Sequence, residues 1–107
     1  MKLIQKHLQD IKMLCDKYFV AELYVFGSVL TENFNPESDI DFLVRFSGVK
    51  PSDYFDNYMD LKENLENLFS RKVDLVEIQT LKNPVLIRSI ERNKTVLYER
   101  KNSKMAV

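Results

Sequence analysis

The chain of 107 residues is 45% hydrophobic, and its 16 basic and 16 acidic residues cancel to a formal net charge of zero. A chain of this length buries roughly two-thirds of its unfolded surface, so we expect a single domain over residues 1–107 that needs no disulfide or structural metal. A neutral chain has no electrostatic field that attracts nucleic acid, which argues against nucleic acid as a direct partner.

The first segment is predicted to form an amphipathic helix over about residues 2–19. Apolar side chains recur there at helical spacing, at Ile4, Leu8, Ile11, Leu14, Cys15 and Tyr18. His7 and Cys15 are then most simply ordinary residues of this helix.

The same segment and the rest of the chain give no sign of export or of membrane insertion. The N-terminus lacks the apolar stretch of a signal peptide, and the single cysteine, Cys15, cannot form an internal disulfide. No run approaches the roughly 20 apolar residues of a membrane span. We therefore expect a cytoplasmic protein with no membrane partner.

Two further segments contain a glycine turn and a pair of aspartates. A strand over 22–26 ends at Gly27 and Ser28, and a polar loop over 31–38 leads to a strand that begins with Asp39 and Asp41. Side chains two positions apart in a strand share a face, so Asp39 and Asp41 point together. The apolar residues Ile40, Phe42, Val44 and Phe46 line the other face. Aspartate is depleted in strands and costly to bury alone, so the pair favours a bound divalent cation.

The Gly27-Ser28 pair is by itself an ordinary strand-ending turn. Together with the aspartates that follow, it indicates a phosphate-binding turn, because Gly27 lets the backbone approach phosphates closely. Ser28 begins what reads as a short helical turn, whose N–H groups would form an anion site together with the Ser28 hydroxyl.

A second helix is predicted over about 51–70, with Tyr54, Tyr58 and Met59 near its start. These side chains would suit base stacking or a protein interface, although a plain core role is favoured. A third helix starts near Pro84, and a last strand covers 95–99. This mixture of strands and helices predicts an α/β sandwich.

Asp74 lies within a further apolar run, 72–76, which also reads as a strand. If this strand lies beside the aspartate strand, Asp74 joins Asp39 and Asp41 in an all-oxygen site, the ligand set that Mg²⁺ or Mn²⁺ prefers. Any one of these aspartates alone is as well explained as a strand-edge residue facing water. Three of them in two apolar strands are hard to explain structurally.

The chain resembles the minimal nucleotidyltransferase family of the DNA polymerase β superfamily. The resemblance is carried by the Gly27-Ser28 pair, by Asp39 and Asp41 after ten intervening residues, and by the later run that contains Asp74. The similarity extends over most of the chain. It implies an α/β (α+β) fold with a small mixed sheet flanked by helices, and transfer of a nucleoside monophosphate from a nucleoside triphosphate. Many members are antitoxins paired with a HEPN-domain ribonuclease toxin, which some of them silence by attaching AMP to a toxin tyrosine.

The resemblance also implies roles for individual residues. Asp39 and Asp41 would hold two Mg²⁺ or Mn²⁺ ions, one of which carries the triphosphate of ATP. Asp74 would complete the shell of the other ion and take the proton from the incoming hydroxyl. Gly27 and Ser28 would contact the nucleotide.

The chain departs from the family pattern after the Gly-Ser pair. Most members read x-Ala-Arg-Gly there, whereas positions 29–32 of this chain read Val-Leu-Thr-Glu, so Thr31 stands in place of an arginine that would help with phosphates or the partner. A different cation could take its place, although a solvated surface charge is the favoured interpretation of each candidate. The candidates are Arg45, Lys72, Arg88 and Arg92, with Lys72 favoured as the nucleotide-binding residue because it lies two positions from Asp74.

Three functions therefore stay open. A protein-modifying enzyme would label a partner toxin only with Asp39 and Asp41 intact. A catalytically lapsed antitoxin would mask the toxin by binding alone, and Asp39→Asn would leave neutralisation untouched. Transfer to a small molecule is disfavoured without a second domain that grips the acceptor, although a homodimer with a shared cleft would provide one. Homo- and hetero-oligomers are both compatible with the sequence.

Overall fold

A computed structural model describes residues 2–27, 31 and 34–100, so the predictions for Ser28 and for positions 29, 30 and 32 lie outside the described residues. The elements, in chain order, are α1 (Lys2–Lys6), α2 (Leu8–Lys17), β1 (Val20–Phe26), β2 (Ile40–Phe46), the 3-10 turn η2 (Pro51–Asp53), α3 (Tyr54–Phe69), β3 (Val73–Glu77), the 3-10 turn η3 (Ile78–Thr80), α4 (Pro84–Asn93) and β4 (Thr95–Glu99). The predicted helices and strands are present, with one helix divided in two.

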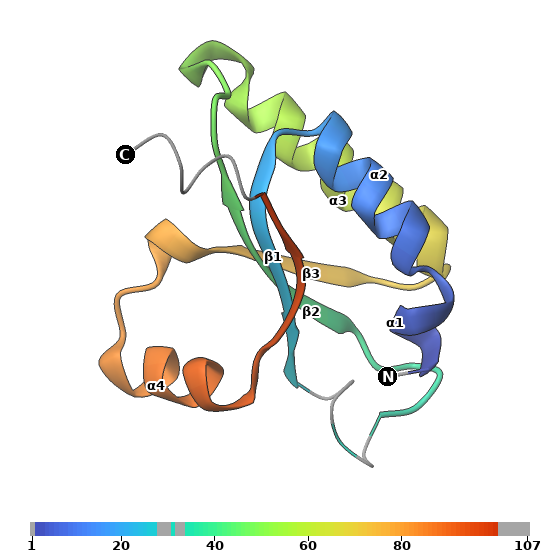
Figure 1. Cartoon of the computed structure of the whole chain (residues 1–107). Coiled ribbons are helices and arrows are strands. Elements are labelled where there is room, and N and C mark those ends of the chain that lie inside the picture. The colour runs from blue at the N-terminus through green and yellow to red at the C-terminus, as the bar shows by residue number, and fades with distance from the viewer. Residues whose placement is uncertain (1, 28–30, 32–33, 101–107) are drawn as a thin grey trace.

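The strands form one mixed sheet in the order β3-β2-β1-β4 (Figure 1). β1 pairs antiparallel with β2 and with β4, and β2 pairs parallel with β3. The parallel pair is possible because α3 carries the chain back along the sheet between β2 and β3. This arrangement confirms the predicted α/β (α+β) class with a small mixed sheet flanked by helices.

One face of the sheet packs against α1, α2 and α3. Figure 1 shows α2 and α3 side by side on this face, away from α4. The main hydrophobic core lies here and takes buried residues from all four strands and three helices, including Ile11, Phe42, Leu65 and Leu97. The alternation predicted for β2 is confirmed, because Ile40, Phe42 and Val44 are all fully buried. We call this face the packed face.

The opposite face carries α4 and a much smaller core. Tyr24, Leu43 and Ile90 form its buried centre. The N-cap of α4 is Asn83, whose side-chain oxygen accepts hydrogen bonds from the N–H groups of Val85 (2.9 Å) and Leu86 (3.3 Å). This side-chain cap and Pro84 in the first turn explain why the helix starts where the sequence predicts. We call this face the α4 face.

The predicted helix over 2–19 is wrong in its continuity. It is interrupted at His7, whose backbone N–H bonds to the carbonyl of Ile4 at 3.1 Å, a tighter turn than the α-helical one. The imidazole of His7 packs edge to face on Phe69, with the ring centroids 5.2 Å apart. Ile4 and Ile11, on either side of the interruption, are both fully buried. Tertiary packing therefore outweighs the local periodicity at this point.

Two tyrosines of α3 tie this helix to β3. The Tyr58 hydroxyl donates to the Leu75 carbonyl, at 2.5 Å, and the Tyr54 hydroxyl donates to the Glu77 carboxylate. Tyr58 also packs against the main core. The structure therefore agrees better with the favoured core role of these tyrosines than with an exposed surface for base stacking. Within the described residues, none of the helices has the length and apolar character needed to cross a bilayer.

Candidate active site

The site is assembled where β1 ends beside the start of β2. Phe26 and Asp41 are direct partners across these two strands. The next residue, Gly27, has a φ of +79°, and a Cβ added to it would lie 2.3 Å from Oδ2 of Asp41. Any side chain at position 27 would therefore collide with this carboxylate, and the positive φ also favours glycine. The predicted closeness of the glycine turn to the aspartates is confirmed for Gly27 and Asp41.

Asp41 and Asp74 lie side by side in the sheet. They are register partners in the parallel pair of β2 and β3, so their side chains project from the same face. Burial and then the negative charges of Asp74 and Asp39 raise the pKa of Asp41 above its ordinary value. The condition set by the sequence, that the Asp74 strand lies beside the aspartate strand, is met.

Asp39 lies just before β2, and the loop that leads to it is held by an arginine. The guanidinium of Arg71 donates to the backbone carbonyls of Asn35 (3.1 Å) and Ser38 (3.0 Å), and it stacks over the ring of Phe34 at 4.7 Å. Arg71 sits between α3 and β3, so it links this loop to the segment that leads to Asp74. Sequence reasoning missed this role, because the contacts join residues more than 30 positions apart.

The three carboxylates are gathered only in part. Among the residues that the structure describes, no three carboxylate, imidazole or thiol groups converge closely enough to hold one ion between them. Asp41 is half-buried beside Asp74, whereas Asp74 and Asp39 are exposed. The donor set does fit Mg²⁺ or Mn²⁺, because it offers only carboxylate oxygens. A divalent cation beside Asp41 would also offset the repulsion from Asp74 and Asp39, which adds to the effect of burial on the pKa of this residue.

A tyrosine approaches Asp74 from α3. Its hydroxyl donates to the carbonyl of Leu75, the residue after Asp74, and burial and then the negative charges of Asp74 and Glu77 raise the pKa of Tyr58. Asp74 is exposed, and its strand β3 lies at one edge of the sheet.

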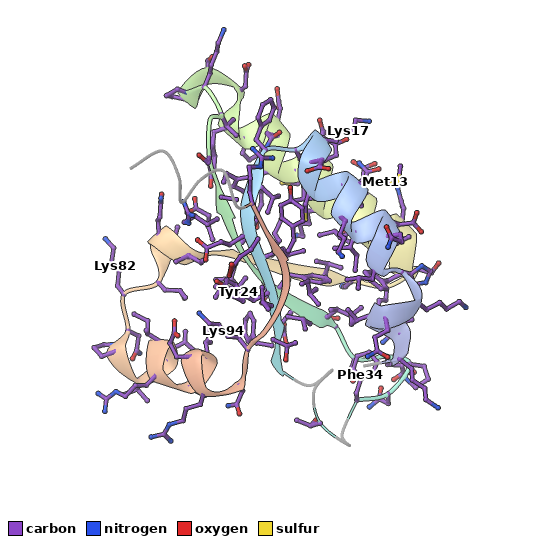
Figure 2. The ribbon with its side chains drawn as sticks, viewed as in Figure 1. Met13, Lys17, Tyr24, Phe34, Lys82 and Lys94 are labelled. Atoms are coloured by element: carbon purple, nitrogen blue, oxygen red, sulfur yellow. The ribbon has the colours of Figure 1, made fainter. Side chains whose placement is uncertain are left out.

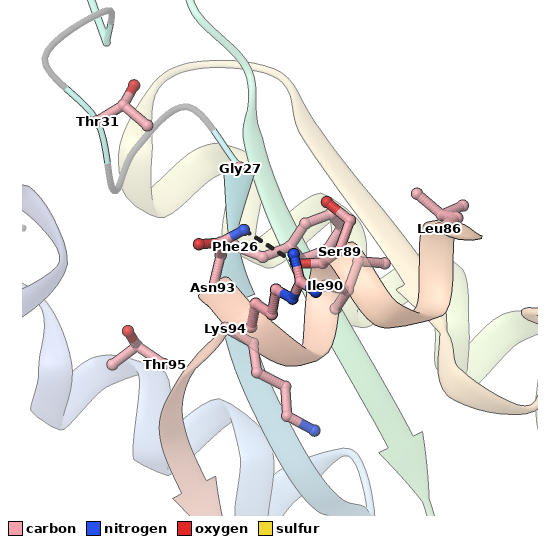
Figure 3. Close-up of a pocket in the computed structure, with 10 residues that line it drawn as sticks. Phe26, Gly27, Thr31, Leu86, Ser89, Ile90, Asn93, Lys94 and Thr95 are labelled. Carbon is pink, nitrogen blue, oxygen red and sulfur yellow. Dashed lines mark hydrogen bonds between the residues drawn. The ribbon is translucent and has the colours of Figure 1, made fainter. Parts of the chain in front are cut away.

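A cavity of about 690 Å³ adjoins the site on the α4 face. Figure 3 shows α4 placing Ser89, Ile90 and Asn93 toward the end of β1. Phe26 and Gly27 line the cavity from β1, and further residues complete its wall: Thr31, Leu86, Arg92, Lys94 and Thr95. Because Gly27 lines the cavity and also lies against the Asp41 carboxylate, one end of the cavity is next to Asp41.

The structure separates the candidate cations. Arg45 is engaged on the α4 face by Glu22, with Nε and Oε2 2.5 Å apart. Lys72 lies just before β3 and is exposed, and its backbone carbonyl accepts a hydrogen bond from the Ile40 N–H at 3.2 Å. Arg92, in contrast, lines the cavity beside Gly27. Spacing along the chain had favoured Lys72, because it could not reveal that α4 returns to the glycine turn.

Comparison with known proteins agrees with this geometry. The family model "Polymerase beta, Nucleotidyltransferase" matches residues 9–103. "Putative protein adenylyltransferase MJ1379" of Methanocaldococcus jannaschii is 38% identical over 93 residues, which cover 86% of this chain and 88% of that protein. "Protein adenylyltransferase MntA" of Thermococcus cleftensis is 36% identical over 88 residues, which cover 82% of this chain and 79% of that protein.

Among solved structures, the complex of a tri-AMPylated Shewanella oneidensis HEPN toxin with an MNT antitoxin is similar in fold. The match has a TM-score of 0.63 and 19% identity, and it covers 95% of this chain and 77% of the matched chain.

Proposed function

This chain belongs to the polymerase β nucleotidyltransferase family, and from that premise we propose that it transfers AMP from ATP to a hydroxyl group of a partner protein. The proposed acceptor is a tyrosine of a HEPN-domain toxin, which the modification would silence. Two relatives more than 35% identical to this chain are named protein adenylyltransferases, and a structural neighbour is an antitoxin bound to an AMPylated HEPN toxin. Since ATP is the donor, we place the reaction in the cytoplasm.

The proposed chemistry is an in-line displacement at the α-phosphorus of ATP. The oxygen of the acceptor hydroxyl forms a bond to this phosphorus, and the bond from the phosphorus to the β-phosphate oxygen breaks. Pyrophosphate leaves with the bonding electron pair, and the proton of the hydroxyl goes to a carboxylate. Asp74 is the proposed base, because it lies beside Asp41 and is exposed at the edge strand, where an acceptor can approach.

Asp39, Asp41 and Asp74 are the proposed ligands of Mg²⁺ or Mn²⁺. Such ions, when bound, neutralise the charge that develops on the attacking and leaving oxygens. Gly27 and Ser28 are the proposed phosphate-binding turn, and Lys72 is a proposed nucleotide-binding cation. The bare backbone of Gly27 supports its part in this assignment, since it keeps the space directly beside Asp41 clear.

One observation carries the proposal: Asp41 is register partner to Asp74 and lies against Gly27, so the turn and two carboxylates meet at one point. The test uses purified protein with α-labelled ATP and Mg²⁺, with and without a co-expressed HEPN toxin. We expect label on a toxin tyrosine with the native chain and none with Asp41→Asn. Asp60→Asn, an exposed aspartate of α3, is the matched control and should label normally.

A second candidate is an antitoxin that neutralises by binding alone. Thr31, which stands where the family pattern has arginine, favours it. The same experiment separates the two functions, because a binding-only antitoxin would hold the toxin tightly and neutralise it with no label. Asp41→Asn would then neutralise as well as the native chain. Labelling of a small molecule in place of the toxin would overturn both candidates.

A further inference from the structure

The cavity on the α4 face differs in charge from the carboxylate site that it adjoins. Among the described residues that line it, the charged side chains are those of Arg92 and Lys94, and none is a carboxylate. The remaining wall is partly apolar, through Phe26, Leu86 and Ile90. A cavity with this lining favours an anionic ligand of moderate size. Since it meets Asp41 at Gly27, such a ligand would extend from the cavity toward the carboxylates.

The two cations of the cavity are not equally available. The ammonium of Lys94 pairs with Oε1 of Glu91 at 3.0 Å and lies 4.2 Å from the centre of the Tyr24 ring, and Figure 2 shows Lys94 beside Tyr24. Arg92 is exposed, and within the described part of the chain no ion pair or hydrogen bond engages its guanidinium. A guanidinium is the side chain best suited to grip a phosphate through two parallel hydrogen bonds.

We infer that Arg92 binds the β- and γ-phosphates of the nucleoside triphosphate and stabilises the departing pyrophosphate. This inference rests on the proposed function and specifies which residue would hold the phosphates of the donor nucleotide. The order of the strands supports an orientation of the nucleotide with its β- and γ-phosphates toward the cavity. The cavity lies beside β1 and Asp74 lies on the edge strand β3, with Asp41 between them. In-line displacement needs the leaving group and the acceptor on opposite sides of the α-phosphorus. Pyrophosphate therefore leaves toward α4, and the acceptor hydroxyl enters from β3.

The experiment measures ATP and adenosine affinity for Arg92→Gln, with Arg88→Gln as the matched control. Arg88 lies one turn earlier on the same helix, is exposed, and does not line the cavity beside Gly27. We expect Arg92→Gln to weaken ATP binding by about tenfold, the loss of one charge-assisted contact, with adenosine binding unchanged. Arg92→Lys should recover part of the loss. Thr31 lines the same cavity, so Thr31→Arg in the Arg92→Gln background should also restore ATP binding.

The outcomes separate this inference from the proposed function. If Arg92→Gln binds ATP as well as the native chain, while Asp41→Asn loses toxin labelling, the role of Arg92 is overturned and the transferase proposal stands. If Arg88→Gln and Arg92→Gln weaken ATP binding equally, the effect comes from the total positive charge of α4 and not from a specific contact. This result would also overturn the inference. A native chain that binds no nucleoside triphosphate would overturn both.

Discussion

The packed face and the α4 face of the sheet use the same strands for different purposes. On the packed face, every strand contributes apolar side chains to a core that three helices cover. On the α4 face, the same strands present Glu22, Asp41, Arg45 and Asp74 around a small apolar centre. Stability is therefore concentrated on one face, and charged groups are concentrated on the other.

This division explains how so small a chain supports a charged site. A carboxylate that is partly buried and lies near others destabilises a fold, as the raised pKa of Asp41 indicates, which burial causes first and the charges of Asp74 and Asp39 second. The packed face offsets this cost with side chains that are fully buried on the helices, such as Ile11, Leu61 and Leu65. The comparison predicts that substitutions on the packed face alter stability, whereas those at the site alter activity.

The largest expected effect comes from matched Leu→Ala substitutions in α3 and α4. Leu65 is fully buried in the packed face, whereas Leu86 is 46% exposed beside the cavity. Leu65→Ala should lower the free energy of unfolding by about 2–5 kcal/mol, because it removes buried surface and leaves a cavity. Leu86→Ala should change it by only about 0.5 kcal/mol. Urea unfolding measures both, and equal losses would contradict the division between the faces.

The second largest effect is expected from Gly→Ala substitutions at two positions, which separate a loss of activity from a loss of stability. Gly27 and Gly48 both have positive φ, at +79° and +88°, so Ala at either position should cost roughly 1–2 kcal/mol of stability. Only at Gly27 does the new Cβ meet a functional group, Oδ2 of Asp41. Gly27→Ala should therefore also lower AMP transfer by about a hundredfold, because a displaced carboxylate loses its alignment.

Gly48→Ala is the control for this experiment, since no atom of the described residues lies within 4 Å of the added Cβ. It should unfold at about the same urea concentration as Gly27→Ala and label the acceptor at the native rate. If both variants lose transfer equally, backbone strain and not the contact with Asp41 is responsible, and the assignment of Gly27 to the site fails.

Local patterns predicted most of the packed face and the contents of the site. The strict alternation around Phe42 identified the buried side of β2, and Pro84 after Asn83 identified the start of α4. The Gly27, Asp41 and Asp74 group emerged from spacing together with one assumption, that two strands are neighbours. The alternation in β2, the start of α4 and the spacing of Gly27 and Asp41 were predictable because each depends on residues close in the sequence, whereas Asp74 joined the group only through that assumption.

The features that sequence reasoning missed depend on contacts between distant segments. The first helix is interrupted at His7, whose ring packs on Phe69, more than 60 residues away. Arg71 holds the Asn35 loop, and α4 places Arg92 in the wall of the cavity that Gly27 also lines, again across long separations. Strand order and helix placement determine those contacts, and periodicity within one segment contains no record of either.

The smallest expected effect is electrostatic and belongs to the α4 face. Burial raises the pKa of Glu22, but hydrogen bonds from Tyr24 and Arg45, and the charge of Arg45, outweigh it, so the net pKa is below the ordinary value. A carboxylate with a depressed pKa stabilises the fold above its unfolded pKa, near 4.3. This stabilisation is lost as the pH falls through the folded value. Glu22→Gln should therefore cost about 1 kcal/mol at neutral pH.

The pH dependence of this difference is what tests the ion pair. Urea unfolding of the native chain and of Glu22→Gln at a series of pH values should give a gap that is full at neutral pH and closes in acid, because protonated Glu22 resembles glutamine. Glu63→Gln, an exposed position on α3, should show no such gap. A gap that persists unchanged into acid would mean that Glu22 acts through its shape and not its charge. In that case the α4 face would be held by packing, as the opposite face is, and the contrast between the two would weaken.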